Sequence, residues 1–248
     1  MIRRSHACAF AALVSLLVIL LGVISLPRIG LAEAQAATTP RVYVVRGGDS
    51  LSALARRFDV TVAALRKANP RIGAAGIIHI GETIVLPKAQ RSTELPATIR
   101  QDPQRLRLRP VIRHWAKKNG IPADLVEATL YLESGWNQAQ ISSTGAIGVG
   151  QIMPRTAAYI KSDLIGRRAG GLALNPAVPE HNIRMSARYL RHLLTVTDGN
   201  VESALHGYYQ GFGSIRANGL YDDSKDYSAA IQALRKRFRS DLTGVDHR

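Results

Sequence analysis

The most regular pattern of apolar and polar positions lies in the middle of the chain. Asn119 and Gly120 interrupt the preceding segment, and Pro122 stands where the first turn of a helix tolerates proline. Residues that favour burial then cover most of the circumference of a helix: Leu125, Val126, Ala128, Thr129, Leu130 and Leu132. The pattern predicts a buried helix that starts near Ile121 and ends at Glu133.

Glu133 is the candidate catalytic residue at the end of this helix. The helix macrodipole is negative at that end, and the neighbouring apolar side chains exclude water. Both effects disfavour a carboxylate. We therefore expect the pKa of Glu133 to be raised toward a value that suits a general acid.

One reaction that needs a carboxyl group as general acid is the cleavage of a glycosidic bond, which ordinarily uses two carboxyl groups. The same helix offers no second one beside Glu133. Asp124 and Glu127 precede it by nine and six residues. At roughly 100° per residue, both point about 120 to 180° away from it. A partner from a distant segment stays open, and the candidates are Asp163, Glu180, Asp198, Asp222, Asp223 and Asp226.

A smaller unit precedes this helix, over residues 42–87. Val42 to Val45 form a β-type run, and Gly47, Gly48 and Asp49 supply turn chemistry. Apolar residues then recur at helical spacing, at Leu51, Leu54, Ala55 and Phe58 and again at Val62, Leu65 and Ala68. A strand at residues 83–86 closes the unit, so the pattern predicts a small βααβ domain.

The stretch between this unit and the larger one, residues 88–103, contains Pro96 and Pro103 with little apolar periodicity. It predicts a linker. The larger domain is then expected over residues 104–240.

Several segments that begin at Glu133 follow one another in a characteristic order. They are Glu133-Ser134-Gly135, Ser142 to Ala146, Gly148 to Pro154, Asn182-Ile183 before Tyr189-Leu190, and Ala204 to Gly211 with Tyr208 at the centre. In this order they resemble the motifs of soluble lytic transglycosylase catalytic domains, which have a mostly helical, lysozyme-like fold. The resemblance makes the expected fold class α+β overall, with the small βααβ domain followed by a mostly α-helical one.

The resemblance implies that peptidoglycan is cut between N-acetylmuramic acid and N-acetylglucosamine. One glutamate acts first as acid and then as base, and the muramoyl C6 hydroxyl closes on the anomeric carbon to give a 1,6-anhydro sugar. A second carboxylate and a cofactor are then unnecessary. Carried over position by position, Glu133 is the acid/base, and Ser142, Gln151, Met153 and Tyr208 are the substrate-binding positions.

The chain departs from the family pattern at two places. Tyr209 stands where many relatives have asparagine, and Gly150 stands where methionine is frequent, which is expected to remove a bulky side chain from a wall of the cleft. For two carried-over positions a purely structural reading also stays open. Ser142 is suited to capping its loop, and Gln151 to satisfying backbone groups there.

The βααβ unit carries a resemblance of its own. Gly48-Asp49-Ser50-Leu51, Asn69-Pro70 and Gly81 to Pro87 are similar to the LysM module, a small binder of glycans that contain N-acetylglucosamine. The resemblance marks Gly48, Asp49 and Asn69 for glycan binding, although all three residue types also form turns. A glycan-holding module tethered to a glycan-cutting domain would raise the local concentration of substrate.

The amino-terminal segment has the composition of an export signal. Arg3 and Arg4 precede an apolar stretch over residues 9–26, and alanines follow at 32, 34, 36 and 37. The favoured interpretation is a cleaved signal over residues 1–36, and an uncleaved membrane anchor is the alternative because the apolar stretch is long. Either way the protein is expected to act outside the cytoplasm, as a secreted or wall-associated protein. Cys8 precedes the apolar stretch, so it is badly placed to carry a lipid.

The net charge of +15 and a pI near 10.6 suit an anionic cell wall. Basic residues are spread through both halves without a nucleic-acid-binding motif, so nucleic acid is not an expected partner. No metal site is predicted, because the chain lacks a His-Glu-x-x-His pattern and His181 and His192 would lie about 16 Å apart on one helix. Two rival functions stay open: a muramidase that admits water, and a wall-binding protein without activity.

Overall fold

The computed structural model describes residues 41–73, 75–89, 94–165 and 173–239. The described residues form one compact unit, and every element described below belongs to it. The predicted export segment, residues 1–36, lies outside the described residues. Within the described ranges, no helix is both long enough and apolar enough to cross a bilayer.

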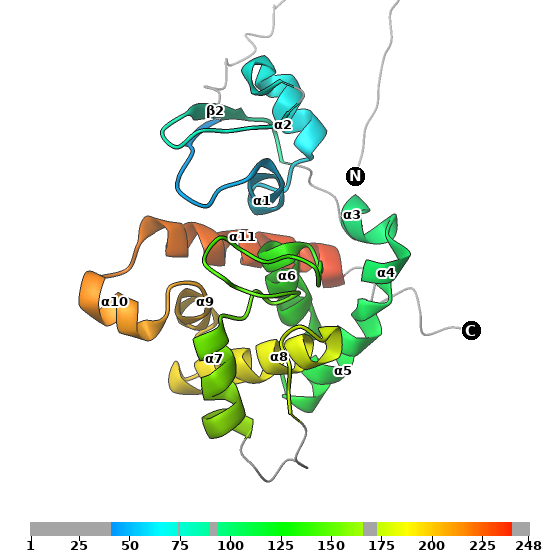
Figure 1. Cartoon of the computed structure of the whole chain (residues 1–248), viewed down its shortest axis with the longest axis vertical. Helices are drawn as coiled ribbons and strands as arrows, with labels where there is room; N and C mark the ends of the chain where they lie inside the picture. Colours follow the sequence, from blue (N-terminus) through cyan, green and yellow to red (C-terminus); the bar gives the residue numbers. More distant parts are fainter. Residues whose placement is uncertain (1–40, 74, 90–93, 166–172, 240–248) are drawn as a thin grey trace, which may run out of the picture. The chain divides into compact units, whose positions relative to one another are not determined.

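An antiparallel pair of strands and two helices form the amino-terminal part of this unit (Figure 1). The elements are β1 (Arg41–Val44), α1 (Leu51–Arg57), α2 (Val62–Ala68), the 3-10 helix η1 (Pro70–Ile72) and β2 (Thr83–Leu86). In the sheet, Arg41 pairs with Leu86 and Val44 pairs with Thr83. The predicted βααβ order is confirmed, with one additional turn of 3-10 helix after α2.

Side-chain caps start both helices of this domain. Ser50 Oγ accepts a hydrogen bond from Ala53 N at 3.2 Å, and Thr61 Oγ1 accepts one from Ala64 N at 2.9 Å. The apolar positions that recur at helical spacing meet the strands in a small core: Tyr43, Val45, Leu51, Leu54, Ala55, Val60, Leu65, Ile72, Ile84 and Leu86. Burial of this apolar set holds the helices on the sheet.

Part of the predicted linker is folded. Residues 97–106 form the short helices α3 (Ala97–Arg100) and α4 (Pro103–Leu106). Asp102 caps α4 by accepting hydrogen bonds from the backbone N–H groups of residues 104 and 105. Leu95 and Ile99 are buried in the core of the larger domain. Two apolar residues four positions apart are too few for a periodic signal, which is why the sequence pattern indicated a linker here.

The described residues after α4 are mostly helical. Their elements are α5 (Leu108–Lys118), α6 (Ala123–Ser134), α7 (Pro154–Tyr159), the π-helix η2 (Ile160–Ile165), α8 (Pro179–Val196), α9 (Val201–Tyr209), α10 (Phe212–Asn218) and α11 (Asp222–Arg239). The loop between α6 and α7 contains isolated β-bridges, which join Ile147 to Ile141 and to Ile152. The predicted fold class, α+β with a small domain followed by a mostly helical one, is confirmed.

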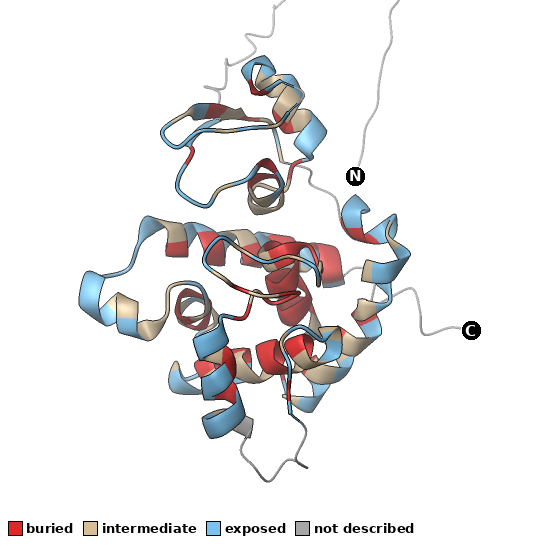
Figure 2. Ribbon diagram, in the orientation of Figure 1, coloured by how far each residue is buried: buried red, intermediate tan, exposed pale blue. Residues whose placement is uncertain are grey.

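Helix α6 is the buried centre of the helical part (Figure 2). It packs against α5 and α11, and Leu125, Ala128 and Leu130 are at most 1% exposed. The helix begins at Ala123, two residues after the predicted start, because Pro122 is its N-cap. A helix that is apolar on every side is stable only inside a core, so the burial of α6 is the expected result of its sequence.

The two other carboxylates of α6 are buried and paired with arginines. Arg109 Nε donates to Glu127 Oε1 at 2.8 Å. Asp124 Oδ2 accepts hydrogen bonds from Arg235 Nε at 2.7 Å and from Arg239 Nε at 2.8 Å. The arginines offset the cost of removing the two carboxylates from water. The same pairs join α6 to α11 through Asp124 and to α5 through Glu127.

Candidate active site

A cavity of about 660 Å³ opens at the carboxyl-terminal end of α6. Its walls come from the β1–α1 loop, α1, the end of α6, the α6–α7 loop and parts of α7, α8, α9 and α11. The cavity brings Glu133 together with all four positions that the transglycosylase resemblance marked for substrate contact: Ser142, Gln151, Met153 and Tyr208.

The Glu-Ser-Gly motif has a separate task for each residue. Gly135 ends α6 with φ 67° and ψ 31°, a left-handed conformation that glycine adopts without strain. Ser134 Oγ donates to Val149 O at 2.8 Å and accepts from Asn137 N at 2.9 Å, so it ties the helix end to the α6–α7 loop. Glu133 is left to face the cavity from the last turn.

Burial raises the pKa of Glu133 from 4.5 to about 7. A hydrogen bond from Tyr227 and the charge of Arg56 both act in the opposite direction and lower that pKa, but burial is the larger effect. The direction agrees with the expectation from the sequence. A carboxyl group with this pKa is protonated in a large fraction of molecules near neutral pH, as a general acid must be.

Tyr227 is the neighbour of Glu133 that the sequence pattern did not reveal. Its hydroxyl donates to Glu133 Oε1 at 2.5 Å from α11. The Tyr227 ring stacks on Tyr209, with centroids 4.7 Å apart and an interplanar angle of 27°. Burial, followed by the neighbouring Glu133 carboxylate, raises the pKa of Tyr227, so its hydroxyl remains a donor. Tyr209, at the family's asparagine position, therefore packs on the tyrosine that bonds to Glu133.

The α6–α7 loop is held by its own side chains. Ser142 Oγ accepts from Ala146 N at 2.9 Å. Gln151 adopts φ 47°, and its Nε2 donates to Gly148 O at 2.9 Å and to Gln140 O at 3.2 Å. The structural readings of Ser142 and Gln151 are thus borne out, and substrate contact by the same side chains stays a prediction.

Asn182, which begins the fourth motif, has a structural task in the α6–α7 loop. From α8, its Nδ2 donates to Ile147 O at 2.8 Å, and its Oδ1 accepts from Gly150 N at 2.8 Å. Tyr208 contributes from α9, since its hydroxyl donates to Gly150 O at 3.0 Å and its ring packs on Tyr189 at 5.5 Å. Asn182 and Tyr208 thus hold the α6–α7 loop against α8 and α9.

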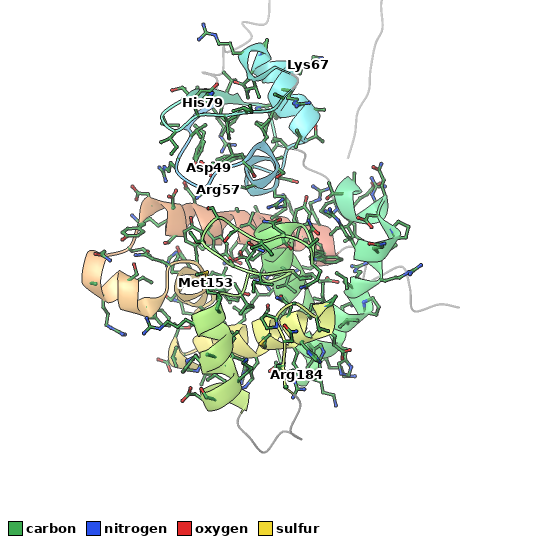
Figure 3. All side chains as sticks on the ribbon, viewed as in Figure 1. Asp49, Arg57, Lys67, His79, Met153 and Arg184 are labelled. Carbon is green, nitrogen blue, oxygen red and sulfur yellow. The ribbon has the colours of Figure 1, made fainter. Side chains whose placement is uncertain are left out.

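Gly150 does not leave the gap in the cleft wall that the sequence suggested. It is buried, and a Cβ atom added there would lie 1.9 Å from Ser186 Oγ and 3.1 Å from a Leu130 methyl carbon. The missing side chain thus allows close packing of the loop on α6 and α8. Met153, labelled in Figure 3, is 38% exposed at the start of α7 and lines the cavity.

Gly150→Ala is expected to destabilise the fold by about 1–3 kcal/mol, because the added methyl group overpacks the contact with Ser186. Urea unfolding followed by circular dichroism measures the loss. Gly213→Ala is the matched control, since nothing lies within 4 Å of its added Cβ. That variant, inside α10, is expected to gain roughly 0.5–1 kcal/mol. Equal stability of the two variants would contradict the packing argument.

The residues that the LysM resemblance marked have structural tasks in the amino-terminal domain. Gly48 has φ 88° in the β1–α1 turn. Asp49 Oδ2 accepts from Tyr43 Oη and from Arg46 N, each at 2.8 Å. Gly48 and Asp49 also line the cavity with Glu133, and Figure 3 labels Asp49.

Asn69 lies in a different part of that domain. Its Nδ2 donates to Leu65 O and Val85 O, each at 2.8 Å, and its Oδ1 accepts from Val85 N at 2.7 Å. The carboxamide therefore joins the end of α2 to β2. Glycan binding at Gly48, Asp49 and Asn69 stays a prediction.

Among the distant carboxylates that were open as partners, three form ion pairs elsewhere in the described part of the chain. Asp226 Oδ2 lies 3.9 Å from Arg57 Nη2. Asp223 accepts from Arg57 Nη2 at 3.2 Å, and Asp222 accepts from Lys225 Nζ at 3.0 Å. The carboxylates among the described cavity-lining residues are Asp49 and Glu133. Glu133 thus has both a raised pKa and a place on the cavity wall.

Comparisons with known proteins match two segments of the chain. Residues 110–231 match the family model of the transglycosylase SLT domain, and residues 43–87 match that of the LysM domain.

Curated relatives carry the name endo-type membrane-bound lytic murein transglycosylase A, from two strains of Klebsiella pneumoniae. They are 35% identical over 71 residues, which cover 29% of this chain and 35% of each relative. The chain thus aligns with about a third of the length of the curated relatives that it matches.

Solved structures with similar coordinates include an inactive variant of the lytic transglycosylase Slt from Pseudomonas aeruginosa and the 70-kDa soluble lytic transglycosylase from Escherichia coli. Their sequence identities are 23% and 22%, and both have a TM-score of 0.47. Each alignment covers 54% of this chain and 24% of the other.

Proposed function

We propose that this protein is a lytic transglycosylase that cleaves the β-1,4 bond between N-acetylmuramic acid and N-acetylglucosamine in peptidoglycan. Glu133 is its single acid/base. The observation that carries the proposal is the Glu133 carboxyl group, which faces the cavity at the end of a buried helix with its pKa raised to about 7. Membership of residues 110–231 in the transglycosylase SLT domain family supports the same reaction.

In the first step, protonated Glu133 gives its proton to the bridging oxygen as the bond to the anomeric carbon breaks. The N-acetylglucosamine side leaves with a free hydroxyl group. Positive charge then develops on the muramoyl ring, and the new carboxylate lies where it stabilises that charge.

In the second step, the carboxylate of Glu133 takes the proton from the muramoyl C6 hydroxyl, whose oxygen bonds to the anomeric carbon. The product is a 1,6-anhydro sugar, and Glu133 returns to its protonated form without consuming water. Attack by a group in the same ring has a high effective concentration. A second protein carboxylate is therefore not needed.

Tyr227 keeps the acid in position through both steps. Its hydroxyl donates to Glu133 Oε1, so the transferable proton belongs on Oε2. A hydrogen bond to the ionised form also keeps the pKa from rising further. The cavity side chains Ser142, Gln151, Met153 and Tyr208 are the proposed contacts for the sugar. Hydroxyl and amide groups suit acetamido and hydroxyl partners, while Met153 and Tyr208 offer apolar contact to a ring.

The two domain matches together support a polymer of the cell wall as the substrate. A LysM domain beside an SLT domain fits binding and cleavage of peptidoglycan, which lies outside the cytoplasm. We infer that residues 1–36 direct export, either as a cleaved signal or as an anchor. The net charge of +15 favours encounter with anionic wall polymers, and the attraction is expected to weaken as salt is added.

Mass spectrometry of the products tests the reaction. Purified protein incubated with peptidoglycan is expected to release muropeptides that end in the 1,6-anhydro sugar, each one water lighter than a hydrolysed fragment. Products with a free reducing end would instead identify a muramidase that admits water. Intact wall that pellets with the protein and releases no fragments would identify a binding protein without activity.

A further inference from the structure

Arg56, on α1 of the LysM domain, reaches the carboxyl-terminal end of α6. Its Nε donates to Leu132 O at 3.3 Å, and its Nη2 donates to Glu133 O at 3.4 Å. Carbonyl groups in the last turn of a helix lack intrahelical donors, and a cation is favoured there because the helix dipole is negative at that end. Arg56 therefore caps α6 at the residue that bears the acid.

Ion pairs connect the same domain to α11, the helix that bears Tyr227. Arg57 Nη2 donates to Asp223 O at 3.1 Å and to Asp223 Oδ1 at 3.2 Å. Asp59, two residues after α1, pairs with Arg237, whose side chain is 5% exposed. Charge-assisted hydrogen bonds of partly buried arginines have specific geometry. These bonds therefore fix the position of α1 relative to α11 and also contribute attraction between the two helices. The LysM domain is thus joined to both helices that supply the catalytic carboxyl group and its tyrosine partner.

The LysM domain also forms part of the cavity wall. The β1–α1 loop, residues 47–50, and Arg56 and Arg57 of α1 line the same cavity as Glu133. Figure 3 labels Arg57 on α1. A module on a flexible tether would change only the local concentration of substrate. Contacts at the end of α6 give this module a second route of action, because they reach the backbone of the acid itself.

We propose that the LysM domain is a working part of the catalytic site, and that Arg56 is the positioning residue through which it holds the Glu133 carboxyl group in place for proton transfer. This proposal rests on the proposed function. It extends that function from a single catalytic domain to a site completed by the preceding domain.

The charged and titratable groups that face Glu133 come from three elements. They are Arg56 on α1, Tyr208 and Tyr209 on α9, and Tyr227 on α11. Arg56 is the cation of this set, and it lowers the pKa of Glu133. Without it, the acid is expected to stay protonated to higher pH, so the alkaline limb of the rate profile moves upward while the misplaced carboxyl group slows the reaction.

The experiment measures kcat and KM on a soluble tetrasaccharide of alternating N-acetylglucosamine and N-acetylmuramic acid, using the full chain. This substrate removes any benefit of holding the enzyme on insoluble wall. Arg56→Met is expected to lower kcat about tenfold, with KM changed less than twofold and the alkaline limb shifted to higher pH. Arg56→Lys keeps the charge and is expected to return the limb toward its original position. Arg71→Met, at an exposed arginine of η1, is the matched control and is expected to match the unaltered protein.

Two outcomes would overturn the proposal. Normal kcat for Arg56→Met on the tetrasaccharide, with weaker pelleting on wall, would reduce the LysM domain to a tether. Equal loss of kcat in Arg56→Met and Arg56→Lys, with an unmoved limb in both, would reduce Arg56 to a structural residue.

A second measurement separates this proposal from the proposed function. The Glu133 carboxyl carbon can be followed by NMR titration in the unaltered chain and in Arg56→Met, with Glu133→Gln to assign the signal. An upward shift of the Glu133 pKa in Arg56→Met supports the contact even if the products turn out to lack the anhydro sugar. An unchanged pKa overturns the positioning role whatever the products are.

Discussion

Glu133→Gln is expected to reduce the release of muropeptides by about 10³-fold, within the range that general acid–base catalysis supplies. Glutamine keeps the size of the side chain and offers an Oε1 to the Tyr227 hydroxyl, but it has no proton to give at neutral pH. Release of soluble fragments from purified wall measures the loss. Pelleting on wall through the LysM domain is expected to be unchanged.

The same substitution is expected to stabilise the protein at alkaline pH. The folded-state pKa of Glu133 is about 7 against 4.5 for an ordinary glutamate, so the folded chain binds more protons than the unfolded chain between these values. Stability therefore falls as pH rises from 4.5 to 7. At 1.36 kcal/mol per unit the full cost is roughly 3 kcal/mol, an upper bound because the residue is partly exposed. Unfolding at pH 8 measures the gain of Glu133→Gln, which should vanish near pH 4.

Glu202→Gln is the matched control for the lysis measurement. Its side chain is 64% exposed on α9. Unaltered lysis is expected there. Undiminished lysis by Glu133→Gln would remove Glu133 from the mechanism. A loss of lysis together with a loss of stability at pH 8 would show that the substitution damages the fold instead of the chemistry.

Tyr227→Phe is expected to lower kcat by about 10- to 100-fold, because a hydrogen bond to an ionised group contributes about 1.5–3 kcal/mol. The ring and its stacking on Tyr209 are retained, so the change isolates the hydroxyl group. Since that hydroxyl lowers the pKa of Glu133, its removal is expected to move the alkaline limb of the kcat profile to higher pH. Initial rates across pH 5 to 9 measure both effects.

Tyr221→Phe provides the comparison for that variant. Tyr221 precedes α11 and is 46% exposed, so loss of its hydroxyl is expected to leave both kcat and the limb unchanged. A Tyr227→Phe enzyme with lowered kcat and an unmoved limb would mean that the hydroxyl contacts the substrate instead of controlling the acid. A normal kcat would exclude Tyr227 from the site.

The central helix and its acid were predictable because their signal is local. A run of apolar residues on every side of α6 has only one stable location, and the glutamate follows that run directly in the sequence. The predicted direction of the pKa shift required no more than this. The βααβ domain was predictable for the same reason, since turn residues and short periodic runs specify each element before any long-range contact forms.

The partners of the acid were not predictable, because they arrive from far along the chain. Tyr227 lies 94 residues after Glu133, and Arg56 lies 77 residues before it. Neither stands in a pattern that distinguishes it from the other polar residues of an amphipathic helix. Gly150 was misjudged for a related reason. A glycine in a loop suggests open space, whereas here the space is already filled by Ser186 of α8.

The self-bonded loop between α6 and α7 has a consequence for how the protein recognises its polymer. The side chains of Ser142 and Gln151 form hydrogen bonds with backbone groups of the same loop. The loop therefore has its final conformation before a sugar binds. The protein therefore loses little conformational entropy on binding, and most of the entropy loss comes from ordering the glycan strand. Stiff, already straightened strands in stretched murein should accordingly be held longer than slack ones.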